Sequence, residues 1–170
     1  FRRDLGAALV ITGGQTMNPS TESFIKAIQT LPNTDIILLP NNPNVLLTAR
    51  QAASLVTDKA VRVVNSRSIP QGIAAMIEYN NVRDDFAVNE LAEAMNQALP
   101  QVVTCEITTA TRSVAIEGVQ VREGQFIGLV NDALSAAGDT LGETVKTTLR
   151  KADADKHELI TLYYGDLVQY

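Results

Sequence analysis

AALVITGGQTMNPSTESFIKAI, residues 7–28, is the stretch that decides the fold. Its apolar run at residues 7–11 predicts a buried strand, and the apolar positions within 24–28 predict the inner face of a helix over about 19–31. The loop between them is rich in glycine, hydroxyl and amide groups. Backbone N–H groups at a helix start are unpaired and carry partial positive charge, and two glycines let the main chain approach a ligand. The stretch therefore predicts a strand, a binding loop and a helix.

The same unit is repeated twice more along the first half of the chain. Predicted strands at residues 35–39 and 61–64 lead into polar loops at 40–44 and 66–72, and helices follow to about Leu55 and Tyr79. Strands that alternate with helices predict a parallel sheet with right-handed crossovers. Ligands of open parallel sheets bind beyond the carboxyl ends of the strands. We therefore expect the three loops to line one edge of the sheet.

These loops supply the candidate residues for binding a ligand or a partner. They are Gly13, Gly14, Gln15, Thr16, Asn18, Ser20, Thr21, Asn41, Asn42, Asn44, Arg67 and Gln71. Neutral donors at helix N-termini can hold a carboxylate or phosphate, and they can equally hold a loop of a partner protein.

Two alternatives to binding stay open for these residues. Asn18 and Asn42 each precede a proline, as an N-cap does before proline at the first helical position, so both could serve only as caps. Arg67 could pair with an anion in bidentate fashion, and Arg112 is a weaker candidate. Both arginines could equally be ordinary surface residues.

The second half of the chain has a different pattern. It predicts an amphipathic helix, a hairpin at a Glu-Gly turn, a further strand, a turn at Asn131-Asp132, a helix capped by Asp139 or Thr140, and a last strand. The corresponding residues are 85–99, 113–121, 126–130, 140–150 and 159–164, with loosely alternating residues at 102–111. We therefore expect an α/β fold with a parallel lobe at 1–82 and a mixed or antiparallel α+β lobe at 83–170.

Composition excludes several classes of function. The net charge of −5 argues against nonspecific binding of nucleic acid, which needs a basic surface. The single cysteine, Cys105, lies in an apolar stretch typical of a buried structural thiol, and the single histidine, His157, lies in a polar run. One Cys and one His cannot form a Cys/His zinc site or a Ser/His/Asp triad, and the chain has no P-loop motif. The sequence predicts no catalytic residue, no metal ligand and no cofactor within this chain.

Neither a membrane-spanning stretch nor a signal peptide is evident in the sequence, so a cytoplasmic location is expected. The chain opens at Phe1 without an initiator methionine and ends at Tyr170, just after a strand-like segment. We interpret it as one piece of a larger protein.

Three motifs carry a resemblance to a known family. ITGGQTMNPSTESF, ILLPNNPNV and SRSIPQGIAAMI resemble the C-terminal region of the bacterial fatty acid kinase family, also called dihydroxyacetone kinase-like. That region has been labelled a "DAK phosphatase" domain. The hairpin TTATRSVAIEGVQVREGQFIGLV and the late ELITLYYG fit the same region in order, so the resemblance covers nearly the whole chain.

The resemblance implies a DegV-like fold and a division of labour within a parent protein. An N-terminal kinase domain would bind ATP and Mg, and the parent could form a homodimer. This region would dock a DegV-like fatty-acid-binding partner, so that the kinase domain phosphorylates the acyl carboxylate. Two other hypotheses stay open, namely that the chain itself binds a small anion or fatty acid, and that it is a phosphatase. The strand-end loops carry amides and hydroxyls rather than converging carboxylates, so their residues give no support to the phosphatase label.

Overall fold

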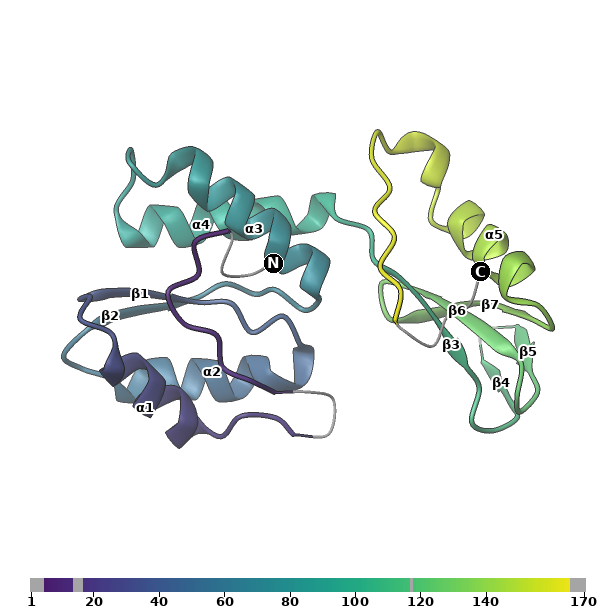
Figure 1. Ribbon diagram of the computed structural model, residues 1–170, viewed down its shortest axis with the longest axis horizontal. Coiled ribbons are helices and arrows are strands. Elements are labelled where there is room, and N and C mark those ends of the chain that lie inside the picture. Colours follow the sequence, from purple (N-terminus) through teal and green to yellow (C-terminus); the bar gives the residue numbers. More distant parts are fainter. Residues whose placement is uncertain (1–4, 14–16, 117, 166–170) are drawn as a thin grey trace. The chain divides into compact units, whose positions relative to one another are not determined.

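The computed structural model describes residues 5–13, 17–116 and 118–165. These residues belong to two compact units, which we call unit 1 (Phe1–Val102) and unit 2 (Val103–Tyr170). Both combine helices with a small sheet, as Figure 1 shows. The α/β class expected from the sequence is confirmed.

Unit 1 is built on two parallel strands. β1 (Asp35–Leu38) and β2 (Ala60–Val63) pair in register from Asp35 opposite Ala60 to Leu38 opposite Val63. The helix α2 (Pro43–Leu55) connects them. This is the βαβ unit that the alternating pattern predicted, and it places the loops after β1 and β2 at the same edge of the sheet.

Helices cover both faces of this parallel pair (Figure 1). One face packs against α1 (Thr21–Thr30) and α2 through strand residues that include Ile36, Leu38 and Val61. The opposite face packs against α3 (Ile69–Val82) and α4 (Val88–Ala98), which leads into the 3-10 helix η1 (Leu99–Gln101). Because side chains alternate along a strand, a continuous apolar run fits a sheet that is buried on both faces.

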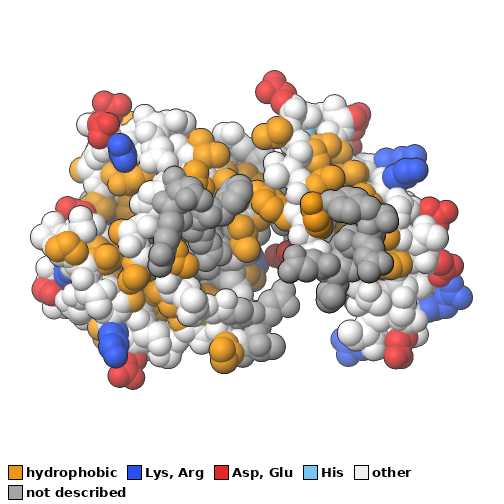
Figure 2. Space-filling model, in the orientation of Figure 1, with side chains coloured by type: hydrophobic (Ala, Val, Ile, Leu, Met, Phe, Trp, Pro, Cys, Tyr) orange, Lys and Arg blue, Asp and Glu red, His pale blue; other side chains and the backbone are white. Residues whose placement is uncertain are grey.

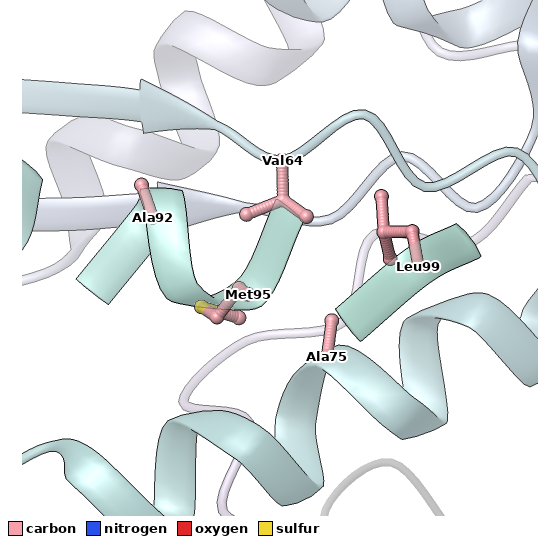
Figure 3. Packing of buried hydrophobic residues seen from close by; sticks show 5 residues of the cluster. All are labelled: Val64, Ala75, Ala92, Met95 and Leu99. Carbon is pink, nitrogen blue, oxygen red and sulfur yellow. The ribbon is translucent and has the colours of Figure 1, made fainter. Parts of the chain in front are cut away.

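Five buried side chains form the core between α3, α4 and the end of β2. Val64, Ala75, Ala92, Met95 and Leu99 point toward one another in Figure 3. Val64 and Ala75 have no exposed surface at all. Because α4 and η1 supply Ala92, Met95 and Leu99 to this core, the division between the units lies after α4, at Val102, rather than before it near residue 82.

Unit 2 contains a three-stranded antiparallel sheet in the order β3-β6-β7 and a separate two-stranded hairpin. The sheet strands are β3 (Cys105–Thr109), β6 (Phe126–Val130) and β7 (Ala133–Gly138). The hairpin consists of β4 (Val114–Ile116) and β5 (Val119–Val121). The helix α5 (Leu141–Lys151) contacts all three strands of the sheet, and the 3-10 helix η2 (Ala154–Lys156) follows it. The hairpin, β6 and α5 with Thr140 as its N-cap confirm the expectations for this half.

The structure adds a strand that was not predicted from the sequence. β7 follows β6 through a two-residue turn at Asn131 and Asp132, whose φ angles of 49° and 70° are those of a type I′ hairpin turn. The turn was predicted, but ALSAAG, the sequence of β7, is poor in the β-branched and aromatic residues that signal a strand.

Two predicted strands are absent. Residues 7–11 form no ladder; Ile11 packs against a cluster that includes Phe24 and Val45, and Asn80 Nδ2 donates to the Leu5 carbonyl at 3.2 Å. Contacts of this kind, rather than sheet hydrogen bonds, fix this segment. Residues 159–164 are also outside every sheet, and their large side chains are exposed. An apolar run forms a strand only where another backbone offers its hydrogen-bonding groups.

Two helix starts also differ from the prediction. Ser20, not Asn18, caps α1, since Ser23 N donates to Ser20 Oγ at 3.1 Å. The helix α3 begins at Ile69, inside the stretch expected to be loop, with Ser68 as its cap. A hydroxyl beside the first turn competes with the asparagine two residues earlier, and spacing alone does not decide between them.

Candidate functional site

The candidate site is the edge of unit 1 where β1 and β2 end, which we call the loop edge. It comprises the loops after these two strands and the starts of α2 and α3. Val64 N donates to the Leu38 carbonyl at 3.0 Å, which extends the pairing of the strands into the loops. The expectation that polar loops share one edge is therefore confirmed for residues 40–44 and 66–72.

Asn41 and Ser66 join the two loops. Asn41 N donates to Ser66 Oγ at 3.1 Å, and the Ser66 side chain is completely buried. Asn41 has a φ of 56°, a left-handed conformation that asparagine tolerates better than most residues. The side chain of Ser66 thus holds the first loop in an unusual backbone conformation.

The side chain of Asn41 lies directly against the backbone of α3. A Cβ added at Gly72 would stand 2.1 Å from Asn41 Oδ1, so only glycine leaves room for the amide. Asn41 Oδ1 is buried and has no hydrogen-bond partner among the described residues. An unsatisfied buried acceptor costs about 1–3 kcal/mol, so this amide is a destabilising feature that calls for an explanation.

Asn42 and Asn44 serve the start of α2. Asn42 Oδ1 accepts a hydrogen bond from Asn44 N at 2.9 Å, so the predicted cap is confirmed. The side chain of Asn42 is therefore occupied, whereas the Asn44 side chain is exposed.

Arg67 and Gln71 meet at the start of α3. Arg67 N donates to Gln71 Oε1 at 2.8 Å, and Gln71 N donates to Ser68 Oγ at 3.3 Å. Arg67 is exposed, and among the described residues no acidic group forms an ion pair with it. Its guanidinium can therefore reach an anionic group on a ligand or partner.

The first predicted loop is described only in part. Gly14, Gln15 and Thr16 lie outside the described residues. A Cβ on Gly13 would be 3.1 Å from Pro19 Cδ, so the loop folds back on itself there. The Asn18 side chain is exposed.

Two further candidates of this loop have structural roles. Ser20 caps α1, and Thr21 Oγ1 donates to Gln51 Oε1 at 3.2 Å, which links α1 to α2.

Sequence reasoning missed a polar network beside the loop edge. Arg50 Nη2 donates to Asn65 Oδ1 at 2.7 Å, and Asn65 N donates to Asn96 Oδ1 at 2.8 Å. Asn96 lies on the amphipathic helix α4, where its position near the apolar stripe was the only signal in the sequence. The network ties α2 and α4 to the loop after β2.

Unit 2 contains a separate groove of about 370 Å³ between the hairpin and the sheet. Its walls are mainly aliphatic, with the charged side chains of Arg112 and Asp132 also lining it; the large aliphatic residues are Val114, Ile116, Val121, Ile127, Leu129 and Leu134. Arg112, the weaker candidate from the sequence, is exposed and has no ion-pair partner among the described residues.

Two ionisable groups of unit 2 have shifted pKa values. A hydrogen bond from Gln125 and the nearby Arg122 guanidinium, 2.9 Å away, lower the pKa of the Asp139 carboxyl. Burial raises the pKa of the Cys105 thiol, which is half-buried in β3. Both shifts reflect local structure in unit 2, away from the loop edge.

Two other kinds of functional feature are absent from the part of the chain that the structure describes. No three His, Cys, Asp or Glu side chains there lie close enough together to hold a metal ion. None of the helices formed by these described residues has the length and apolar character needed to cross a membrane.

Comparison with known proteins places the chain among a group of bacterial proteins. The FakA-like C-terminal family, whose description names a fatty acid kinase, matches residues 1–169. Protein YloV of Bacillus subtilis is 34% identical over 96% of the chain, and an uncharacterized protein of Staphylococcus aureus (strain MRSA252) is 37% identical over 96%. The chain spans 29% of the length of each of these relatives.

One solved structure shares the fold. A DegV lipid binding protein of Thermotoga maritima aligns with a TM-score of 0.59 over 81% of this chain and 55% of that protein, at 14% sequence identity. The similarity confirms the DegV-like fold expected from the motifs.

Proposed function

Because the chain belongs to the FakA-like C-terminal family of fatty acid kinases, we propose that it is the non-catalytic docking domain of a fatty-acid-kinase-like protein. It would bind a DegV-like fatty-acid-binding partner at the loop edge. A kinase domain elsewhere in the parent protein would bind ATP and Mg and phosphorylate the acyl carboxylate. The relatives are more than three times as long as this chain, which leaves room for such a domain.

The observation that carries this proposal is the composition of the loop edge. It offers the exposed guanidinium of Arg67 and the exposed amide of Asn44. Leu47 near the start of α2 and Ile69 at the start of α3 are large apolar side chains that are exposed beside them. Apolar anchors surrounded by polar groups are typical of protein–protein interfaces. Figure 2 shows apolar side chains at several places on the visible face of unit 1.

A matched pair of leucines on α2 tests the docking role. Leu47 is 77% exposed near the loop edge, and Leu55 is 58% exposed at the opposite end of the same helix. Calorimetric titration with the DegV-like partner should show affinity at least about tenfold weaker for Leu47→Ser, as expected for an interfacial anchor worth more than about 1 kcal/mol. Leu55→Ser should bind like the wild type.

Stability and the parent protein supply the controls for that titration. Both leucines are exposed, so both variants should keep the melting temperature of the wild type within about 2 °C. Equal affinities for the two variants would place the interface elsewhere. Failure of this chain to bind a partner that the full-length parent does bind would overturn the docking role.

The groove in unit 2 favours a second candidate function, the binding of a fatty acid or another amphipathic anion by this chain itself. Its volume falls within the range of small-molecule sites, about 300–1,000 Å³. The aliphatic walls suit an alkyl chain, and the guanidinium of Arg112 suits a carboxylate. This function and docking of a partner at the loop edge use different surfaces and are separable by experiment.

Arg112→Ala tests this second candidate. If the groove binds a fatty acid, a medium-chain fatty acid should raise the melting temperature of the wild type, and Arg112→Ala should abolish most of that rise. Arg150→Ala, an exposed arginine near the end of α5, is the matched control and should respond like the wild type. Absence of any rise, together with no lipid in mass spectra of the purified protein, would exclude the fatty acid as ligand.

A further inference from the structure

One edge of the sheet in unit 2 is open. β3 pairs with β6 on one side only. Asn131 N donates to the Thr104 carbonyl and Ala110 N donates to the Gln125 carbonyl, each at 2.8 Å. In an antiparallel ladder the groups of alternate residues point the opposite way. The N–H and C=O groups of Cys105, Ile107 and Thr109 therefore point toward the outer edge, where none of the described strands pairs with them.

The helix α5 leads the chain toward this open edge. Thr144, in its first half, lies over Gly138 at the end of β7, and Thr148, one turn later, lies over Gly128 in the middle of β6. The helix also contacts β3. Since the strand order is β7-β6-β3, α5 crosses the sheet from the β7 edge toward the outer edge of β3.

The segment that follows α5 has the composition of a strand but no place in the sheet. Residues 159–162 are Leu-Ile-Thr-Leu, and the side chains of Leu159 and Leu162 are 81% and 72% exposed. A short connection at 152–158 joins the segment to α5. Exposed aliphatic side chains beside an open sheet edge are a hazard that folded proteins usually cover.

We propose that residues 159–162 act as a strap that closes onto the outer edge of β3 in the same chain, as a parallel strand. β7 runs parallel to β3, because each is antiparallel to β6. A helical crossover from β7 returns the next strand in the direction of β7, which is also the direction of β3. The short tether gives the segment a high effective concentration at its own sheet, which favours closure within one chain over pairing with a second copy. This inference is independent of the docking role of unit 1.

The pleat predicts which strap residues meet which side chains of β3. Ile107 is opposite Gly128 in the ladder, and Gly128 faces α5, so Ile107 and Cys105 share that face. Ile160 and Leu162 would join Cys105 on the covered face. Thr161 would then point to the opposite face, beside the polar side chains of Glu106 and Thr108.

Disulfide formation with Cys105, the single native cysteine, tests the strap. Under alkaline oxidising conditions, which ionise a thiol whose pKa burial has raised, Ile160→Cys or Leu162→Cys should cross-link to Cys105 within one chain. Thr161→Cys should cross-link several-fold less, because its side chain points away. Adding Cys105→Ser to each variant should abolish the product, and intact mass with thiol titration measures the yield.

Each alternative outcome contradicts the strap. Equal yields at positions 160, 161 and 162 would show a freely moving segment, and no yield at any of them would show that it stays away from β3. A disulfide-linked dimer in place of the internal cross-link would show pairing between two copies. Hydrogen exchange gives a second measurement: Thr161→Pro, which removes one strand donor, should increase exchange at the amides of Cys105, Ile107 and Thr109.

Discussion

Gly128→Ala is expected to lower the free energy of unfolding by about 1–3 kcal/mol, the usual cost of overpacking a close-packed interior. A Cβ at position 128 would stand 1.8 Å from Thr148 Oγ1 and 3.0 Å from Thr148 Cβ. Thr148 cannot move aside easily, because its side chain is completely buried and Oγ1 donates to the Thr144 carbonyl at 2.8 Å. Urea titration followed by circular dichroism measures the change.

Two further variants show whether the clash is the cause. Thr148→Ala removes the hydroxyl that the new methyl group would meet, so Gly128→Ala should cost less in that background than in the wild type. Gly142→Ala is the matched control: Gly142 lies in α5 with open space around its Cβ position, and alanine should stabilise the helix there by up to about 1 kcal/mol. Additive losses for the pair of substitutions at 128 and 148 would contradict this explanation.

The contrast between β7 and the hairpin shows which parts of the fold were readable from the sequence. The hairpin and β6 were predicted because apolar residues alternate with clear turn residues. β7 was missed because its alanines and glycine answer to a neighbour: Gly138 lies within 2.7 Å of Thr144 Oγ1 at its Cβ position. The close approach of α5 sets this composition, and no pattern within the strand itself reveals that helix.

The candidate site was predictable to a similar extent. Proline and asparagine after β1 correctly located a loop and the cap of α2, because capping is a local interaction. The contact between Asn41 and Gly72 joins loops that follow two different strands, 31 positions apart in the sequence. Such a contact depends on the parallel pairing of β1 with β2. The sequence therefore identified Asn41 as a candidate but not the reason why glycine stands opposite it.

Gly72→Ala should destabilise the loop edge by about 1–3 kcal/mol, although alanine is the better helix former. The added methyl group would meet Asn41 Oδ1 at 2.1 Å and Asn41 Cγ at 2.5 Å. The backbone of Asn41 cannot retreat without losing its hydrogen bond to Ser66 Oγ. The free energy of unfolding from urea titration gives the size of the effect.

Asn41→Gly should rescue Gly72→Ala, because glycine tolerates the φ of 56° and has no amide to meet the new methyl group. A double variant no more stable than Gly72→Ala alone would show that the clash lies elsewhere. By itself, Asn41→Gly removes a buried oxygen without a hydrogen-bond partner, worth about 1–3 kcal/mol, against an entropic loss of about 0.5–1 kcal/mol. The single variant should therefore be at least as stable as the wild type. If the Asn41 amide serves the partner, this variant will bind the DegV-like protein more weakly in the same calorimetric titration. Unchanged affinity would assign the amide no role in docking.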